Sequence, residues 1–524
     1  MVIFNDFYGA MDRIYASESR ARTVPPEQQL KVMPGQSVQA GRGQGSFIDK
    51  LNSIVKKGAN TVEFALSGQE AEPFGAAAES YGKELRQTLK DIQKATGVKV
   101  NSIHAPADAI GNVSGFSKDG FAEQERERSI TEVKKAIDFA ADVTMGGTSV
   151  VVHTGEYPRT INFDGFKGAG DDILYFANQR TGKVTGISKE QKFQVPKLDE
   201  KKPYIEIDNY KIPQYQKDKE GMIVVENLSY SDMVSRAKEE MKKLGDPKAD
   251  KYTPEEALIK SLYAQQLQQA KGDAMRFSAQ AEQYKAELDN IPVQIEEVNN
   301  DPRIPKEQKP LVIARINAEK HRIAQHLHGV NETASSQMQK ARQLEEEMNN
   351  LKPIKTVAEQ KTSKSFSELG IYAMRKTEEK GLKKPIFVAP ENLIPDFGYG
   401  AHPRELAELV VNARKQMAKD LVNMGYTEEK AMQKAREHIK ATMDTQHLGM
   451  WRRHFEPKEN ENPEDTDKRF KKWYLEQVKE LQNSEKKYGA YGKDIIGNIH
   501  AVDGWGYGHT HLPLGEGANP IKDA

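Results

Sequence analysis

Three of the chain's twelve histidines fall within one glycine-rich stretch near the C-terminal end, NIHAVDGWGYGHTHLPLGEG at 498–517. His509 and His511 are separated by one residue, so in an extended loop both side chains could point to the same side. The glycines around them allow the backbone to fold back on itself. Imidazole nitrogen is a common ligand of zinc. The stretch is therefore either a loop with ordinary polar histidines or one corner of a metal site.

Five ionisable side chains, one of them a histidine of this stretch, occupy equivalent positions, each at or next to the carboxyl end of a different predicted strand. They are His104, His153, Glu391, Asp444 and His500. In a barrel of parallel strands these ends converge on one mouth, where active sites are found. A single histidine there is usually a hydrogen-bonded structural residue, but burying five ionisable groups together costs too much free energy unless a cation compensates. The pattern predicts a metal site, and His447, three residues after Asp444, extends it.

The composition restricts the metal chemistry and the partners. There is no cysteine, which excludes thiolate ligands, disulfides and a cysteine nucleophile. Histidine and carboxylate must hold any metal, which favours zinc, and manganese or iron would also fit. Lysine plus arginine equals aspartate plus glutamate at 77 each, so no overall field attracts nucleic acid or anionic lipid, and any phosphate binding must be local. With no basic leader and no run of roughly eighteen apolar residues, we expect a soluble, cytoplasmic protein without a membrane partner.

Alternating strand and helix patterns must position these residues. Short β-rich segments separated by amphipathic helical patterns are typical of a parallel sheet. The seven segments that carry the predicted strands are 37–42, 61–66, 98–106, 148–156, 386–393, 441–451 and 495–504, and within 441–451 the strand is expected to end at Asp444. Without a large insertion, the remaining roughly 300 residues match the usual size of a (β/α)8 TIM-type barrel. The sequence thus predicts an α/β barrel that lacks its last strand, for which the N-terminal MVIFND, ending at Asp6, is a candidate.

The chain is expected to have four parts, which are an N-terminal extension (1–35), a first barrel half (36–156), an insertion (157–365) and a second barrel half (366–524). Alternating segments at 160–230 predict a β-rich patch within the insertion. Residues 254–352 are rich in Ala, Gln, Glu and Lys around the break NNDPRIPKEQKP, which predicts a helical hairpin of coiled-coil type. Its charged faces would be solvated surface, or would bind nucleic acid or a protein partner, and its length would also suit a homo-oligomer.

The order of motifs resembles a known family. HAP, VVVHTG, PEN, DTQH, NIHAVDG, HTH and LGEG follow one another on successive predicted strands. This series is similar to the xylose-isomerase-like TIM barrel superfamily and, within it, to the endonuclease IV family of apurinic/apyrimidinic endonucleases. The resemblance covers about 36–156 and 385–517, and it leaves the insertion and the N-terminal extension unexplained.

This resemblance implies up to three zinc ions in the barrel mouth. His104 and His153 would hold the first with Glu391 as a bridging carboxylate, and Glu391, Asp444 and His500 would hold the second. The third would be held by His447, His509 and His511. Glu391 and Asp444 are the candidate catalytic residues.

The chain departs from the family pattern in two places. The family has an aspartate where this chain has His509, so the third site gains a neutral ligand in place of a charged one. The family's last strand also supplies a further glutamate to the second zinc, whereas this sequence ends at LGEGANPIKDA before such a strand. The second departure puts the completeness of the metal site in question.

Three functions remain open at this point. The resemblance implies metal-dependent phosphodiester hydrolysis, as in DNA repair at abasic sites. Arg42, after the first predicted strand, is either a phosphate contact for this reaction or, as is more common, an ordinary surface arginine. A sugar or sugar-phosphate isomerase or epimerase of the same superfamily would need one metal on Glu391, Asp444 and His500, but neither His104 and His153 nor the HTH loop. A degenerate, non-catalytic barrel that serves assembly through its insertion is the third. The number of candidate ligands favours the hydrolase.

Overall fold

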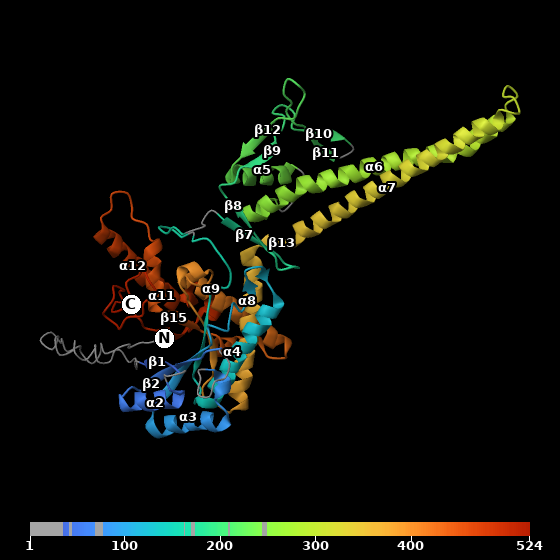
Figure 1. The fold of residues 1–524 in the computed structure, drawn as a ribbon. Coiled ribbons are helices and arrows are strands. Elements are labelled where there is room, and N and C mark those ends of the chain that lie inside the picture. Colours follow the sequence, from blue (N-terminus) through green and yellow to red (C-terminus); the bar gives the residue numbers. More distant parts are fainter. Residues whose placement is uncertain are drawn as a thin grey trace. The chain divides into compact units, whose positions relative to one another are not determined.

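Seven parallel strands form one sheet, and they coincide with the seven strands expected from the sequence (Figure 1). They are β1 (Gly35–Gln39), β2 (Thr61–Ala65), β3 (Lys99–His104), β6 (Ser149–His153), β14 (Phe387–Glu391), β15 (Ala441–Asp444) and β16 (Ile496–His500). Their order in the sheet follows their order in the chain. This order is expected when each strand returns through a right-handed crossover to pair with its predecessor.

The computed structural model describes residues 35–40, 45–68, 77–161, 163–168, 173–207, 210–243 and 249–523. These residues divide into two compact units. The first contains the sheet and comprises the described residues up to Ala177 together with Thr181–Ile187 and those from Ile354 onwards. The second comprises Asn178–Arg180 and the described part of Ser188–Pro353.

The sheet curls on itself, because residues of strands far apart in the sheet touch. Five strand positions separate β2 from β16, which in a flat sheet would place them roughly 24 Å apart at ~4.8 Å per strand. Yet His500 on β16 donates a hydrogen bond of 2.9 Å to Glu63 on β2. The ring of His500 also stacks on that of His104 on β3, with centroids 6.2 Å apart. The described strands therefore form an open, curled half-barrel.

The expected closed barrel is not shown by the described residues. Within them β1 and β16 each pair with one neighbour only, so the sheet has two free edges. Ile499 on β16 is 51% exposed, as expected beside an open edge. The candidate eighth strand MVIFND, with Asp6, lies outside the described residues, as does Arg42.

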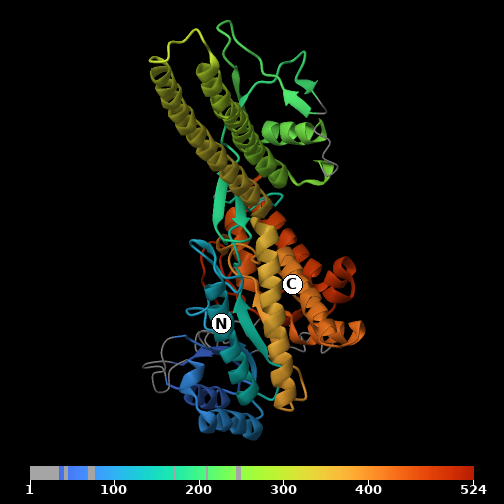
Figure 2. The same cartoon turned by 90° about the vertical axis from the view of Figure 1, so that its right-hand side faces the viewer.

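Helices cover the outer face of the sheet. In chain order they are α2 (Phe47–Lys56), α3 (Lys83–Thr96), α4 (Glu123–Val143), α8 (Ile354–Glu379), α9 (Pro403–Asn423), α10 (Glu428–His438), α11 (Thr445–Gly449), α12 (Pro463–Gln482) and α13 (Ser484–Tyr488). Helix α8 packs between α4 and α9, as Figure 2 shows. Apolar residues at helical spacing bury one face of each helix, as Phe47 does against Phe64 of β2 at 4.4 Å between ring centroids. This shell fixes the strands whose ends carry the candidate ligands.

One element boundary is confirmed and another differs from the expectation. As expected, β15 ends at Asp444, and α11 begins at Thr445, because the Asp444 carboxylate accepts a hydrogen bond from the His447 backbone N–H and caps the helix. Helix α8 begins at Ile354, twelve residues before the point at which the helical pattern was expected to resume. Buried Val357 and Ala358 explain this start, since they already pack in the first unit.

The first unit also contains short elements outside the main sheet. They are β4 (Phe116–Ser117), β5 (Gly120–Phe121) and the 3-10 turns Ala78–Ser80 and Pro395–Phe397. Two further 3-10 turns follow, at Met450–His454 and Gly489–Gly492. Strands β7 (Ile173–Asn178) and β8 (Val184–Ser188) are assigned to the first unit except for their last residues, Asn178 and Ser188.

The second unit combines short strands with a helical hairpin. Strands β9 (Phe193–Pro196) and β12 (Val225–Leu228) pair antiparallel, as do β10 (Tyr204–Ile207) and β11 (Tyr210–Pro213). Helix α5 (Tyr230–Lys243), a 3-10 turn at Ala249–Lys251 and strand β13 (Leu351–Pro353) complete it. Helices α6 (Pro254–Asn300) and α7 (Lys309–Asn350) run side by side along their length (Figures 1 and 2). A capping box of Thr253 and Glu256 starts α6.

Across the described part of the chain, none of these helices combines the length and the apolar character that a membrane crossing would need. The longest of them, α6 and α7, carry charged residues throughout their sequences.

Candidate metal centre

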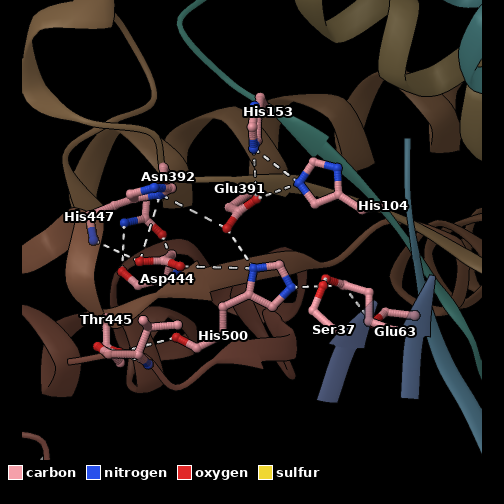
Figure 3. Close-up of polar contacts among 12 residues, drawn as sticks. Ser37, Glu63, His104, His153, Glu391, Asn392, Asp444, Thr445, His447 and His500 are labelled. Atoms are coloured by element: carbon pink, nitrogen blue, oxygen red, sulfur yellow. Dashed lines mark hydrogen bonds and ion pairs between the residues drawn. The ribbon is translucent and has the colours of Figure 1, made fainter. Parts of the chain in front are cut away.

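The pairing of the strands places the candidate ligands side by side. Glu391 lies opposite His153 in the β14–β6 ladder, and Asp444 lies opposite His500 in the β15–β16 ladder. His104 ends β3, the other neighbour of β6. Because all strands are parallel, these residues share one edge of the half-barrel. Figure 3 shows the side chains pointing toward one another in its interior.

His104, His153 and Glu391 form the first group of potential ligands. The Nε2 atoms of the two histidines are 3.0 Å apart, and Glu391 Oε2 lies 3.4 Å from His104 Nε2 and 3.5 Å from His153 Nε2. His104 Nδ1 donates to the carbonyl of Ala105 at 2.8 Å. A carbonyl only accepts, so Nδ1 carries the proton and Nε2 of neutral His104 is left with a lone pair aimed at the group. This arrangement suits a cation between the three side chains.

Glu391, Asp444 and His500 meet at the middle of the site. His500 Nδ1 lies 2.7 Å from Glu391 Oε1 and 3.9 Å from Asp444 Oδ2. Glu391 and Asp444 also group with His447, whose Nδ1 lies 3.9 Å from Glu391 Oε1 and 3.7 Å from Asp444 Oδ1. However, His447 Nδ1 donates to the Asn392 carbonyl at 2.8 Å, so its free nitrogen faces elsewhere. His500 is therefore the better-placed imidazole for this position.

His447, His509 and His511 form a separate, all-imidazole group. Their ligand atoms lie within 4.8 Å of one another, and His447 Nε2 is 2.7 Å from His509 Nε2. As in His104, the carbonyl contact of His447 Nδ1 leaves its Nε2 as the lone-pair nitrogen. The ring centroids of His509 and His511 are 4.5 Å apart. The HTH stretch thus does place both histidines on the side of His447.

The loop that carries the HTH stretch is held by a buried aspartate. Asp503, 2% exposed, accepts hydrogen bonds from the backbone N–H groups of Gly504, Gly515 and Asn519. Gly504 and Gly517 leave no room for a Cβ beside Gln446 and Asp503. Because the loop is anchored at both ends, His509 and His511 are presented from a fixed backbone rather than from a free tail.

Asn392 and Thr445 fix the strand ends around the ligands. The Asn392 side chain donates to the Asp444 carbonyl at 3.0 Å and accepts from the Asp444 N–H at 2.8 Å. Thr445 Oγ1 donates to the His500 carbonyl at 3.1 Å and accepts from Val502 N–H at 2.8 Å. Asn392 lies in the motif PEN and Thr445 in the motif DTQH, and each joins its own segment to the neighbouring strand end beside the ligands (Figure 3).

Glu63 on β2 is a site residue that the sequence analysis missed. It is 6% exposed and accepts hydrogen bonds from Ser37 Oγ at 3.0 Å, Ser102 Oγ at 2.7 Å and His500 Nε2 at 2.9 Å. Its carboxylate therefore binds the nitrogen of His500 that points away from Glu391 and Asp444. A hydrogen bond of this kind orients an imidazole whose other nitrogen binds a metal. The TVEFA strand gives no local sign of this role.

The electrostatics reflect a site crowded with imidazoles and carboxylates. Burial and, after it, the neighbouring His104 lower the pKa of His153 to about 3. Burial, together with His509 and His447, lowers the pKa of His511 to about 3. Both histidines are therefore neutral at pH 7, the form that binds metals.

His500 is the exception among these imidazoles. Burial alone would lower its pKa, but the carboxylates of Glu63 and Glu391 outweigh this effect and raise it to about 10. Burial opposes the charge of Glu391 and of Glu63, but His500 and further nearby positive groups together hold the pKa of both carboxyls well below the ordinary value. Without a cation, a protonated His500 would thus lie between two carboxylates.

The donor set fits divalent metal ions. Glu391 Oε2 and Asp444 Oδ2 are buried and have no hydrogen-bond partner among the described residues. In two places imidazole nitrogens face each other, His104 with His153 at 3.0 Å and His447 with His509 at 2.7 Å. In each pair a backbone carbonyl fixes the proton of one ring, His104 or His447, on Nδ1, the nitrogen that points away from the partner ring. Orphaned carboxylate oxygens and converging imidazole lone pairs are the features that a zinc site provides.

Glu156, just beyond β6, is a buried carboxyl outside the ligand groups. Its Oε2 accepts from Ser114 N–H at 2.8 Å, and its Oε1 has no hydrogen-bond partner within the described chain. Burial raises its pKa from 4.5 to about 7. The folded state therefore binds a proton more tightly than the unfolded state, and the free energy of unfolding falls as pH rises from about 4.5 to about 7.

We expect Glu156→Gln to remove this part of the pH dependence. The free energy of unfolding of the variant, compared with that of the unchanged protein, should rise by roughly 2 to 3 kcal/mol between pH 5 and pH 8, since one pKa unit corresponds to ~1.4 kcal/mol. Urea unfolding at both pH values measures the difference, with the exposed Glu84→Gln as the matched control. If the free energies of unfolding of the variant and of the unchanged protein differ by the same amount at both pH values, the prediction is wrong.

Comparisons with known proteins add no family. A scan against protein-family models finds no match, and a search of curated proteins finds no significant relative. The resemblance to the endonuclease IV family therefore stays a prediction that rests on the order of the motifs.

Proposed function

We propose that the protein is a metal-dependent phosphodiesterase that acts on abasic DNA or a related phosphodiester. The observation that carries this proposal is the set of three ligand groups at one end of the half-barrel, of which two are rich in imidazole. Bound divalent ions would polarise the phosphoryl oxygens and lower the pKa of an attacking water. Glu391 would join two of the positions, because Oε2 faces His104 and His153 while Oε1 faces His500.

The charge of the ligand set supports an anionic substrate. His104, His153, His447, His500, His509 and His511 would bind metals as neutral imidazoles, so Glu391 and Asp444 alone would supply negative charge to the ions. Two or three divalent ions on this set would keep a net positive charge. A phosphodiester is the kind of group that such a site attracts, even though the whole chain has no net charge.

A sugar or sugar-phosphate isomerase is the second candidate. Glu391, Asp444 and His500 lie close enough to hold a single metal without the other groups. Such an enzyme does not need the all-imidazole group, so the HTH loop separates the two proposals.

The discriminating experiment replaces both His509 and His511 with alanine. We expect the loss of about one metal equivalent and of most hydrolysis of an abasic-site duplex, because the third position would lose two of three ligands. Neither side chain belongs to the buried core, so circular dichroism should show an intact fold.

A matched control exists in the same chain. His326 and His328 on α7 have the same spacing and are exposed, so their double alanine variant should keep metal content and activity. An unchanged metal content in the His509/His511 variant would remove the third position and favour the isomerase.

A further inference from the structure

A cavity of about 320 Å³ opens beside His153. The loops that follow β3, β6 and β14 line it, so it lies at the same end of the half-barrel as the ligand groups. Its walls are mainly apolar, with Ile110, Phe116, Pro158, Leu393 and Phe397 as the larger side chains. A concave, mostly apolar site with a few polar groups is the usual form of a small-molecule pocket.

His153 connects the cavity with the candidate metal centre. Its Nε2 lies 3.5 Å from Glu391 Oε2, while its ring also lines the cavity. The His153 side chain is 28% exposed, whereas those of His104 and Glu391 are 9% and 0% exposed. Solvent therefore reaches the first ligand group past His153. A molecule held at this group by one end would place its next atoms in the cavity.

The lining residues indicate the chemical class of those atoms. Among the described residues that line the cavity there is no lysine or arginine, and Asp396 is the only carboxylate. The Asp396 carboxylate is paired with Arg453 and His454. The cavity thus offers no cation to a second phosphate. Phe397, 60% exposed, and the half-buried Phe116 offer ring faces and edges instead.

We propose that this cavity binds an uncharged planar ring, such as a nucleobase, carried by the phosphoester that the metal centre would bind. The inference rests on the proposed function and narrows it. The substrate is then a phosphoester with a flat, uncharged substituent close to the reacting phosphate, and the cavity selects this substituent. Apolar burial and ring contacts supply the affinity, since the walls contain few hydrogen-bonding groups.

The test compares two ligands that differ only in this substituent. Binding of methyl phosphate and of phenyl phosphate to the zinc-loaded protein is measured by calorimetry. Phenyl phosphate should bind at least about 10-fold more tightly, because burying part of the ring surface contributes on this order. Phe397→Ala should bring the ratio of the two dissociation constants towards one. Ala107→Phe, which fills the cavity from its exposed wall, should do the same.

A control and the possible outcomes separate this inference from the proposed function. Met424 at the end of α9 is 52% exposed and does not line the cavity, so Met424→Ala should keep the ratio of the unchanged protein. Equal binding of the two phosphates would overturn the cavity proposal and leave the metal-dependent function standing. If neither phosphate binds the zinc-loaded protein, both proposals fail.

Discussion

Replacing Glu391 with glutamine is expected to remove about two metal equivalents and to abolish phosphodiesterase activity, since this carboxylate faces two ligand positions. Glu391 is fully buried, and its two oxygens contact different partners: Oε2 faces His104 and His153, and Oε1 faces His500. Glutamine has nearly the same shape but no charge. The change therefore removes the anion that would hold two cations near each other while disturbing the packing little.

A buried carboxylate outside the site provides the matched control. Glu405 on α9 is 7% exposed and pairs with Arg159 at 2.7 Å, away from the ligand groups. Glu405→Gln should lower stability but leave the metal content per folded chain unchanged. Metal analysis and a thermal unfolding curve on both variants distinguish the two effects. A Glu391→Gln protein with a full complement of metal would show that this residue is not a ligand.

Replacing Glu63 with alanine is expected to weaken metal binding by about 10- to 100-fold without removing any ligand. This range is typical when the hydrogen-bond partner of a metal-binding histidine is lost. Glu63 accepts the His500 Nε2 proton at 2.9 Å, and Ser37 and Ser102 hold the carboxylate in place. Without this acceptor the imidazole can rotate, and its Nδ1 no longer points steadily at Glu391.

Glu63→Gln separates this role from a purely structural one. The amide oxygen can still accept from His500 Nε2, so competition with a chelator should show much of the affinity restored relative to Glu63→Ala. Both variants lose the buried charge, and unfolding curves give the stability cost of each. If the two variants bind zinc equally weakly, or if Glu63→Ala binds as tightly as the unchanged protein, Glu63 does not position His500.

The strand ends were predictable because they depend on local patterns. Buried β-rich runs such as SVVVH and FVAPE stand out from the helices around them, and the last residue of each run is polar. In a parallel sheet these ends must lie on one edge, so the gathering of His153 and Glu391 follows from the fold class alone. The helices α6 and α7 were predictable for a similar reason, since their composition favours helix and the proline-bearing break interrupts it.

The contacts that complete the site depend on distant residues and could not be predicted in this way. Glu63 lies within an ordinary strand pattern, and its partner His500 is 437 residues away. The orientation of His500 depends on the curl of the sheet, which local patterns do not determine. Asp503 holds its loop through backbone groups that have no sequence signature.

The closure of the half-barrel is a third feature that sequence patterns left open. The expected number of strands came from counting alone, and among the described residues β1 and β16 each pair with one neighbour only. Within this part of the chain, the further carboxylate beside His500 is that of Glu63, which contacts His500 Nε2. The site as described therefore relies on imidazole nitrogen for most of its potential ligands.

The most direct test of the account is metal analysis of the purified chain after equilibration with zinc and removal of loosely bound ions. We expect about three zinc equivalents per chain, one for each ligand group. About one equivalent would restrict the site to Glu391, Asp444 and His500 and would favour the isomerase. A chain that retains no zinc, manganese or iron would contradict the account, and His500 would then serve as a buried cation between Glu63 and Glu391 in a non-catalytic half-barrel.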